Sequence, residues 1–408
     1  MHRTTAALSS HNNGERMQLA NCNVLDIRHG RILRDSSVTI ESGVIEDVGG
    51  LPSRYASVLN TIDLGGLTVV PGLVDAHVHT CMTGDGSALN RYLSEPSRVT
   101  LLRSMANLSR SLRAGVTTIR DVGSPTPLIL LLRDLQAQGL IAGPRILASG
   151  SVVTTEGGHC HYFGVQVQGV PAIQTAVHDL AVVGVDFIKV MGSGGNLTNG
   201  TDPSRSQFSY DEMKALVSAA RGAEKKVSCH AHSEEAIAVA IEAGVDSIEH
   251  GSYATKHQID LMSQRRICLV PTLAPASRTL KVLGQNVSET VKDRVWCRIE
   301  ATMLAIERGV RILAGTDAGI PHMPHGNVAE EVIRLAQLGL SPVDAMRAAM
   351  TNVCEWLGIA DKLGAVEQGM LADLLVIEGN PLENPTTLSK PIMVIQGGTV
   401  VCTNSEFI

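Results

Sequence analysis

The fold of this 408-residue chain is decided by one segment, Pro71-Gly72-Leu73-Val74-Asp75-Ala76-His77-Val78-His79-Thr80. Its apolar and β-branched residues predict a β-strand. His77 and His79 are two residues apart, so on a strand both imidazoles leave from the same face. Two imidazoles on one face begin a metal site, although a polar strand face explains the pair equally well when it is taken alone.

The composition is that of a globular enzyme, with 44% hydrophobic and 18% charged residues. A net charge of −6, the absence of a basic run and only 3% aromatic residues argue against a nucleic-acid partner. No apolar run approaches the length of a membrane span. Eight scattered cysteines without a C-x-x-C pair favour a reducing compartment, and residues 1–16 lack the apolar core of a signal peptide. We therefore expect a cytoplasmic protein.

Both ends of the chain have the pattern of short strands broken by turns. Residues 17–70 show it first, and residues 364–408 repeat it, with Gly397-Gly398 placed between two β runs as in a hairpin. Residues 1–16 read as a disordered polar tail. The two ends are therefore predicted to form one small β-sandwich domain around a different middle.

In the middle, residues 71–363, strand patterns alternate with helical patterns. After the opening segment, seven more strands are predicted at 116–120, 145–148, 186–190, 227–230, 247–250, 267–270 and 310–314. Helical patterns fill most gaps, for example at 211–224, 234–243 and 294–308. Repeated strand–helix units predict parallel strands, and eight of them predict an α/β fold with a (β/α)8 TIM-like barrel. Such a barrel places its chemistry at the C-terminal ends of the strands.

Residue types that bind metals stand at those predicted strand ends. They are His77, His79, Lys189, His230, His250 and Asp317. Any one of them is weak evidence, but their shared position predicts a metal site at the barrel mouth. His232 shares its strand face with His230, and the spacing alone does not separate these two.

The chain resembles the amidohydrolase superfamily of metal-dependent hydrolases over nearly everything after residue 17. The resemblance rests on the opening segment, the six residues above and the closing pattern Gly364-x4-Gly369-x2-Ala372-Asp373-Leu374. Within the superfamily, the chain is most similar to the branch of imidazolonepropionase-like proteins and Xaa-Pro dipeptidases. The local signs are Ser247-Ile248-Glu249-His250-Gly251-Ser252-Tyr253, Val270-Pro271-Thr272-Leu273 and Gly157-Gly158-His159.

The resemblance implies two divalent metal ions. It makes His77, His79 and Asp317 ligands of one, and His230 and His250 ligands of the other, with zinc favoured by the histidine-rich set. Lys189 is then N-carboxylated and bridges both ions, which agrees with physics because an ammonium beside two dications is repelled. Imidazolonepropionases lack this lysine, so Lys189 favours the dipeptidase branch.

The same resemblance implies a mechanism and a substrate site. A metal-bridging hydroxide attacks the amide carbonyl, and Asp317 carries the proton to the leaving nitrogen. His159 is the preferred residue for holding the substrate carbonyl or carboxylate, with His161 as the alternative, and Tyr253 is expected to bind a substrate carboxylate. The loop 192–208 is expected to overlie the site. The roles of His232, His322 and His325 stay open.

Three functions are weighed on this basis. The favoured one is a binuclear amidohydrolase that cleaves a peptide-like amide C–N bond of a dipeptide or N-acyl amino acid. The second is a hydrolase of a cyclic amide, or of a xenobiotic amide or carbamate, on the same metals. The third, a non-enzymatic barrel used for binding or assembly, would require the loss of ligands, and none is lost. We expect a small-molecule substrate, and the sequence leaves a homo-oligomer open.

Overall fold

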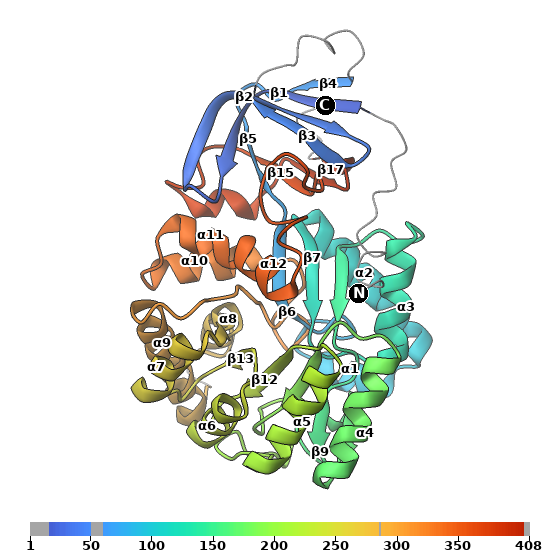
Figure 1. Cartoon of the computed structure of the whole chain (residues 1–408), viewed down its shortest axis with the longest axis vertical. Coiled ribbons are helices and arrows are strands. Elements are labelled where there is room, and N and C mark those ends of the chain that lie inside the picture. Colours follow the sequence, from blue (N-terminus) through green and yellow to red (C-terminus); the bar gives the residue numbers. More distant parts are fainter. Residues whose placement is uncertain (1–15, 50–59, 285–286, 404–408) are drawn as a thin grey trace.

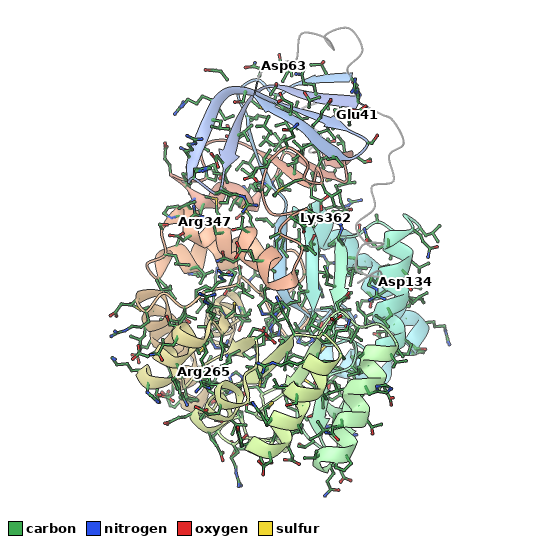
Figure 2. The ribbon with its side chains drawn as sticks, in the orientation of Figure 1. Glu41, Asp63, Asp134, Arg265, Arg347 and Lys362 are labelled. Carbon is green, nitrogen blue, oxygen red and sulfur yellow. The ribbon has the colours of Figure 1, made fainter. Side chains whose placement is uncertain are left out.

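The computed structural model describes residues 16–49, 60–284 and 287–403. Figure 1 shows a β-rich part, built from both ends of the chain, above a larger part in which helices surround parallel strands. The predicted tail, residues 1–16, lies outside the described residues except for Arg16, which begins the first strand. Figure 2 shows charged side chains such as Asp134 and Arg265 on the outside of the helices, as expected for helices that bury only one face.

The β-rich part is a single eight-stranded sheet with the order β17-β16-β15-β5-β1-β2-β3, and β4 pairs with β1. β5 and β15 pair antiparallel, so the two ends of the chain share one sheet. β16 and β17 form the predicted hairpin, with positive φ at both Gly397 and Gly398. The strands are β1 (Arg16–Asp26), β2 (Arg31–Glu41), β3 (Val44–Gly49), β4 (Asn60–Asp63), β5 (Thr68–Pro71), β15 (Leu374–Ile377), β16 (Met393–Gln396) and β17 (Thr399–Thr403).

The middle of the chain contains two parallel sheets, which confirms the α/β class with parallel strands. One has the order β6-β7-β8 and the other β10-β9-β11-β12-β13-β14, and every pair in both is parallel. The strands are β6 (Leu73–Val78), β7 (Val116–Asp121), β8 (Arg145–Ala148), β9 (Val153–Thr155), β10 (Val165–Val167), β11 (Ile188–Met191), β12 (Val227–Ala231), β13 (Ser247–His250) and β14 (Cys268–Val270).

The eighth predicted strand, residues 310–314, is not a regular strand. It makes an isolated parallel bridge to β14 through Ile312. Its hydrogen bonding is interrupted because the N–H of Ala314 donates to the carbonyl of Ala348, while the carbonyl of Ala314 accepts from Ala76 in β6. The prediction of a regular strand here was therefore wrong, although the segment does hydrogen-bond to both β14 and β6.

Helices follow most of the parallel strands. They are α1 (Ala88–Ser94), α2 (Ser97–Arg113), α3 (Thr126–Ala137), α4 (Gly169–Val182), α5 (Tyr210–Gly222), α6 (Glu234–Ala243), α7 (Lys256–Arg265), α8 (Leu273–Leu283), α9 (Glu289–Glu307), α10 (Val328–Gln337), α11 (Pro342–Ala348) and α12 (Thr351–Leu357). α5 begins at a capping box, in which Ser209 and Glu212 satisfy each other's backbone N–H groups. Across the described ranges, none of the helices combines the length and the apolar character needed to cross a bilayer.

Candidate metal centre and cavity

The first ligand cluster joins His77 and His79 to Asp317. His77 lies in β6 and His79 directly follows it, and both Nε2 atoms are 3.3 Å from Oδ1 of Asp317. Nδ1 of His79 lies 2.8 Å from the carbonyl oxygen of Gly123 and donates to it, so Nε2 is the ring nitrogen that faces Asp317. The ligand atoms of the three side chains lie within 4.8 Å of one another, and two imidazoles with one carboxylate suit a divalent metal.

The charge of this cluster also suits a metal ion. Burial raises the pKa of the Asp317 carboxyl, but the neighbouring His77 and His79 outweigh burial and hold this pKa well below its usual range. Asp317 is therefore ionised at neutral pH, which a carboxylate ligand requires.

The second cluster consists of three histidines, His230, His232 and His250, with ligand atoms within 4.8 Å of one another. His230 lies in β12 and His250 ends β13. Nδ1 of His232 is 2.9 Å from Oγ of Ser252, and Nδ1 of His250 is 2.7 Å from Oγ1 of Thr272. Burial, followed by neighbouring positive charge, holds the pKa of all three well below the usual value, so they are neutral and able to bind metal. The choice of His230 over His232 as a ligand stays a prediction, because the structure brings both into the cluster.

Lys189 lies in β11 and faces the same cavity as both clusters. Its side chain is 1% exposed, and its Nζ has no hydrogen-bond partner among the described residues. Burial lowers the pKa of this amine, since an unpaired buried ammonium is costly. A buried amine without a partner among the described residues, on the same cavity wall as two sets of potential metal ligands, would suit a carbamate shared by two ions, so the residues present fit the implied binuclear centre.

The backbone is strained where the ligands are placed. His250 has a φ of 71°, Thr272 one of 50° and Asp317 one of 55°, all in the left-handed region that favours glycine. Such conformations persist only where the surroundings impose them, and they are common at functional sites. Two of the six predicted ligands therefore sit on strained backbone.

A fully buried ion pair lies behind the first cluster. The guanidinium of Arg120, in β7, donates to both carboxylate oxygens of Glu249 at 2.8 Å, and the hydroxyls of Ser228 and Ser247 donate to the same carboxylate. Oε2 of Glu249 also lies 2.7 Å from Nδ1 of His77. Burial raises the pKa of Glu249, but Arg120 outweighs it and keeps the carboxylate ionised. Glu249 thus holds the Nδ1 proton of His77 and directs Nε2 towards Asp317.

A cavity of about 600 Å³ opens onto both clusters and Lys189. All six predicted metal ligands contribute to its wall, and so do His159, His232 and His322. Apolar side chains also line it, among them Leu197, Pro275, Ala276, Val287, Val291, Val295 and Ile320. The cavity therefore combines a mostly apolar lining with the predicted metal ligands, as is typical of small-molecule sites.

His159 and His161 differ in their placement. His159 is buried in the cavity wall, its ring centroid lies 4.7 Å from that of His230, and its Nδ1 has no hydrogen-bond partner among the described residues. Burial lowers its pKa to about 3, so the ring is neutral. Nδ1 of His161 instead bonds the carbonyl of Gly158, and His161 does not line the cavity.

The loop 192–208 contributes Asn196 and Leu197 to the cavity wall. The carbonyl oxygen of Gly194 is 3.1 Å from Nε2 of His230, so the loop contacts the second cluster directly. A side chain at position 195 would collide with the ring of His159, which explains the glycine there.

The remaining candidates differ in whether they line the cavity. The hydroxyl of Tyr253 donates to Asp293 at 3.0 Å, and Tyr253 does not line the cavity. His325 is buried against the carbonyl of Met82 and is not part of the wall either, whereas His322 is. A substrate role for Tyr253 therefore stays a prediction that the observed contacts do not require.

Four charged residues at or behind the site were not singled out from the sequence: Arg120, Glu249, Arg294 and Arg298. Glu249 does stand beside His250 in a predicted strand. Arg294 and Arg298 have the i, i+4 spacing of one helix face, together with the apolar Val291 and Val295. A basic pair on the buried face of a helix is a signal that can be read from the sequence.

The comparisons with known proteins agree with this site. Residues 68–401 match the model of the amidohydrolase family. The chain is 29% identical to the ochratoxinase of Aspergillus niger, over 89% of this chain and 81% of that protein. It is 24% identical to the imidazolonepropionase of Deinococcus radiodurans, over 85% of this chain and 86% of that protein.

Among solved structures, the chain is similar to a Xaa-Pro dipeptidase with bound methionine in its active site. The TM-score is 0.85 with 30% sequence identity, and the match covers 95% of this chain and 99% of the dipeptidase. The predicted relation to both imidazolonepropionases and Xaa-Pro dipeptidases is thus confirmed.

Proposed function

This chain belongs to the amidohydrolase family, and we propose that it is a binuclear enzyme cleaving a peptide-like amide bond next to a carboxylate, as in a dipeptide or N-acyl amino acid. Its family and its relatives support a metal-dependent amide hydrolase. The second metal, the N-carboxylated Lys189, zinc as the metal and the substrate class belong to the proposal.

One observation carries the proposal. His77, His79 and Asp317 on one side, and His230, His232 and His250 on the other, face a single cavity with Lys189. The ring centroids of His77 and His250 are only 5.2 Å apart, so the two clusters are neighbours. This proximity supports a pair of metals that share a ligand, with Lys189 as the residue available to both.

Two bound divalent ions would supply a nucleophile from water at neutral pH and would polarise the amide carbonyl. The residues of the chain perform the remaining tasks. Asp317 accepts the proton of the attacking water and passes it to the leaving nitrogen, because an amide nitrogen leaves poorly as an anion. Glu249 keeps the ring of His77 in the tautomer that binds metal, and the apolar wall excludes water from the reacting bond.

His159 is proposed to contact the substrate. It lies against His230 on the cavity wall, and its free Nδ1 is available for hydrogen bonding. Because Tyr253 does not line the cavity, we propose that it does not contact the substrate directly. A His159→Asn variant should lower kcat/KM without changing the metal content, and an unchanged kcat/KM would reject this role.

The apolar wall favours a second candidate function. A cyclic amide, or a xenobiotic amide or carbamate, would also fill a cavity lined by valine, proline and leucine side chains. The ochratoxinase similarity points the same way. The partner remains a small molecule in both cases, and a cytoplasmic location and a homo-oligomer stay predictions.

The proposal includes the predicted architecture. Residues 71–363 would close into a (β/α)8 barrel, and residues 17–70 with 364–408 would form a β-sandwich domain. Hydrogen bonds from Ala76 and His79 to the carbonyls of Ala314 and Ala318 support closure, because they tie β6 to the segment beside β14. An experimental structure with β6 remote from this segment would contradict closure.

The decisive experiment is a substrate screen of the metal-reconstituted protein. We expect hydrolysis of dipeptides or N-acyl amino acids, with kcat/KM at least tenfold higher for the free acid than for its amide. Turnover restricted to cyclic amides, carbamates or uncharged xenobiotic amides would instead select the second candidate.

A further inference from the structure

One wall of the cavity contains two buried arginines. Arg294 and Arg298 lie four residues apart in α9, on the same face of the helix, and their side chains border the cavity. Their exposed fractions are only 6% and 8%. Arginine is rarely buried to this extent unless its charge is paired or a ligand meets it.

In the part of the chain that the structure describes, no charged carboxylate is paired with either arginine. Glu331 lies near Arg298, but burial raises the pKa of Glu331 to about 8, so that group is mostly neutral at pH 7. Among the residues that the structure describes, neither guanidinium forms a salt bridge with a carboxylate, and Asp317 is the sole carboxylate on the cavity wall. Asp317 is already held by His77 and His79. Burial lowers the pKa of Arg298 to about 10, so it keeps its charge at neutral pH. Two neighbouring cations in an apolar wall favour an anion between them.

The hydrogen bonds of Arg298 leave part of its guanidinium free. Nε donates to Oγ of Ser252, and one terminal nitrogen donates to the carbonyl and hydroxyl oxygens of Thr272, all at 3.1 Å. These three bonds use three of five N–H groups. The other terminal nitrogen has no partner among the described residues, which leaves two donors for a ligand.

The guanidinium of Arg294 makes fewer hydrogen bonds than that of Arg298. One of its terminal nitrogens donates to Oδ1 of Asn196, in the loop beside the cavity, and its guanidinium also contacts the hydroxyl of Tyr253. Its Nε is buried without any partner among the described residues. An unsatisfied buried donor on a charged group is costly, so the Arg294 guanidinium is short of hydrogen-bond partners.

We propose that Arg294 and Arg298 form the carboxylate-binding subsite of the cavity. The inference rests on the proposed function and names what selects its substrate: an amide with a free carboxylate at the α9 wall and an apolar group against Val291, Val295 and Pro275. In this proposal Arg294, and not Tyr253, binds the substrate carboxylate. The hydroxyl of Tyr253 contacts the Arg294 guanidinium and positions it.

The test variant has to spare the metal centre. Arg298 holds the hydroxyls of Ser252 and Thr272, which in turn contact His232 and His250, so its loss would disturb the second cluster as well. Arg294 makes no such contact. Arg294→Met is therefore the primary variant, and Arg294→Gln, which keeps a donor for Asn196, replaces it if the methionine variant does not fold. Lys292→Met is the matched control, because Lys292 is a cation of the same helix that pairs with Glu289 on the surface.

The measurement is the binding of N-methanesulfonyl-L-leucine and its amide to the metal-loaded proteins by isothermal titration calorimetry, because the sulfonamide bond is not an amide that the enzyme can hydrolyse. We expect wild type and Lys292→Met to prefer the acid, and the Arg294 variant to bind the acid roughly tenfold to hundredfold more weakly with little change for the amide. Equal losses for acid and amide, or no preference in the wild type, would overturn the subsite. A wild type that prefers the acid but hydrolyses no acyl amino acid or dipeptide would refute the proposed function and leave the subsite intact.

Discussion

Oε2 of Glu249 lies 2.7 Å from Nδ1 of His77, and both side chains are buried. Glu249 stands next to one predicted ligand, His250, in β13, and it orients another predicted ligand, His77, in β6. The guanidinium of Arg120 donates to both oxygens of the same carboxylate. One buried network therefore connects β6, β7 and β13 behind the metal-binding side chains.

This network leads to a prediction about metal affinity. Glu249→Gln removes the anion that holds the Nδ1 proton of His77, and we expect metal affinity to fall roughly tenfold to hundredfold. Thermal stability should fall too, because Arg120 loses its buried counter-charge. Metal competition with a chelator measures the first effect, with Glu242→Gln, a surface partner of Arg265, as control. An unchanged metal affinity in a folded Glu249→Gln protein would show that His77 needs no such support.

The role of Lys189 can be tested by removal and rescue. Lys189→Ala should lose metal and activity, because the bridging oxygens are gone while the histidines remain. Short-chain carboxylic acids should restore part of both, since they return two oxygens to the same space. Metal analysis and kcat with and without added acetate or propionate measure this. If Lys189→Ala retains full metal content and activity without any added acid, Lys189 does not bridge.

Asp317 can be tested as a proton carrier separately from its role as a ligand. Asp317→Asn keeps the shape and one ligating oxygen but cannot accept a proton. We expect much of the metal to be retained while kcat drops by about 10²–10⁴. Substrates with activated leaving groups, such as p-nitroanilides, should suffer less because they need less protonation. Turnover of an ordinary amide within a few-fold of wild type, with both metals bound, would make Asp317 a ligand only.

The pH dependence of stability has a separate source in α10. Glu331 is buried and accepts the backbone N–H groups of Leu273 and Ala274, and burial raises its pKa from 4.5 to about 8. Between these values the folded protein binds more protons than the unfolded chain, so stability falls as pH rises. The loss is at most about 1.4 kcal/mol per pH unit.

Glu331→Gln removes this titration and keeps an acceptor for one of the two N–H groups. We therefore expect the Tm of the wild type to fall relative to the variant from pH 5 to pH 8. Thermal unfolding at four pH values in this range measures the difference. A difference in Tm that does not change with pH would mean that Glu331 titrates normally.

The convergence of the predicted metal ligands on one cavity followed from the sequence because parallel strands end at one edge and side chains on a strand alternate. These two rules place His77, His79, His230 and His250 together without any knowledge of tertiary packing. The arginines of α9 were not predicted, because a helical pattern shows which face is buried but not which space that face meets.

The irregular segment 310–314 was mispredicted for a similar reason. Its sequence is that of a strand, and Leu313 does donate to Leu269 in β14, but the N–H of Ala314 donates to the carbonyl of Ala348, which is distant along the chain. Local propensity contains no information about such a competitor. The ends of the chain posed no such problem, since antiparallel pairing of β5 with β15 follows from two short strand patterns that both need partners.

Two metal ions are proposed to share the cavity, and the metal content of the reconstituted wild-type protein measures this. The protein should be stripped of metal, reloaded with zinc in the presence of bicarbonate, freed of excess ion and analysed by mass spectrometry. We expect close to two zinc ions per chain in the wild type, and we expect Lys189→Ala to lose both metal and activity. No more than one tightly bound ion per chain in the active wild type would contradict it.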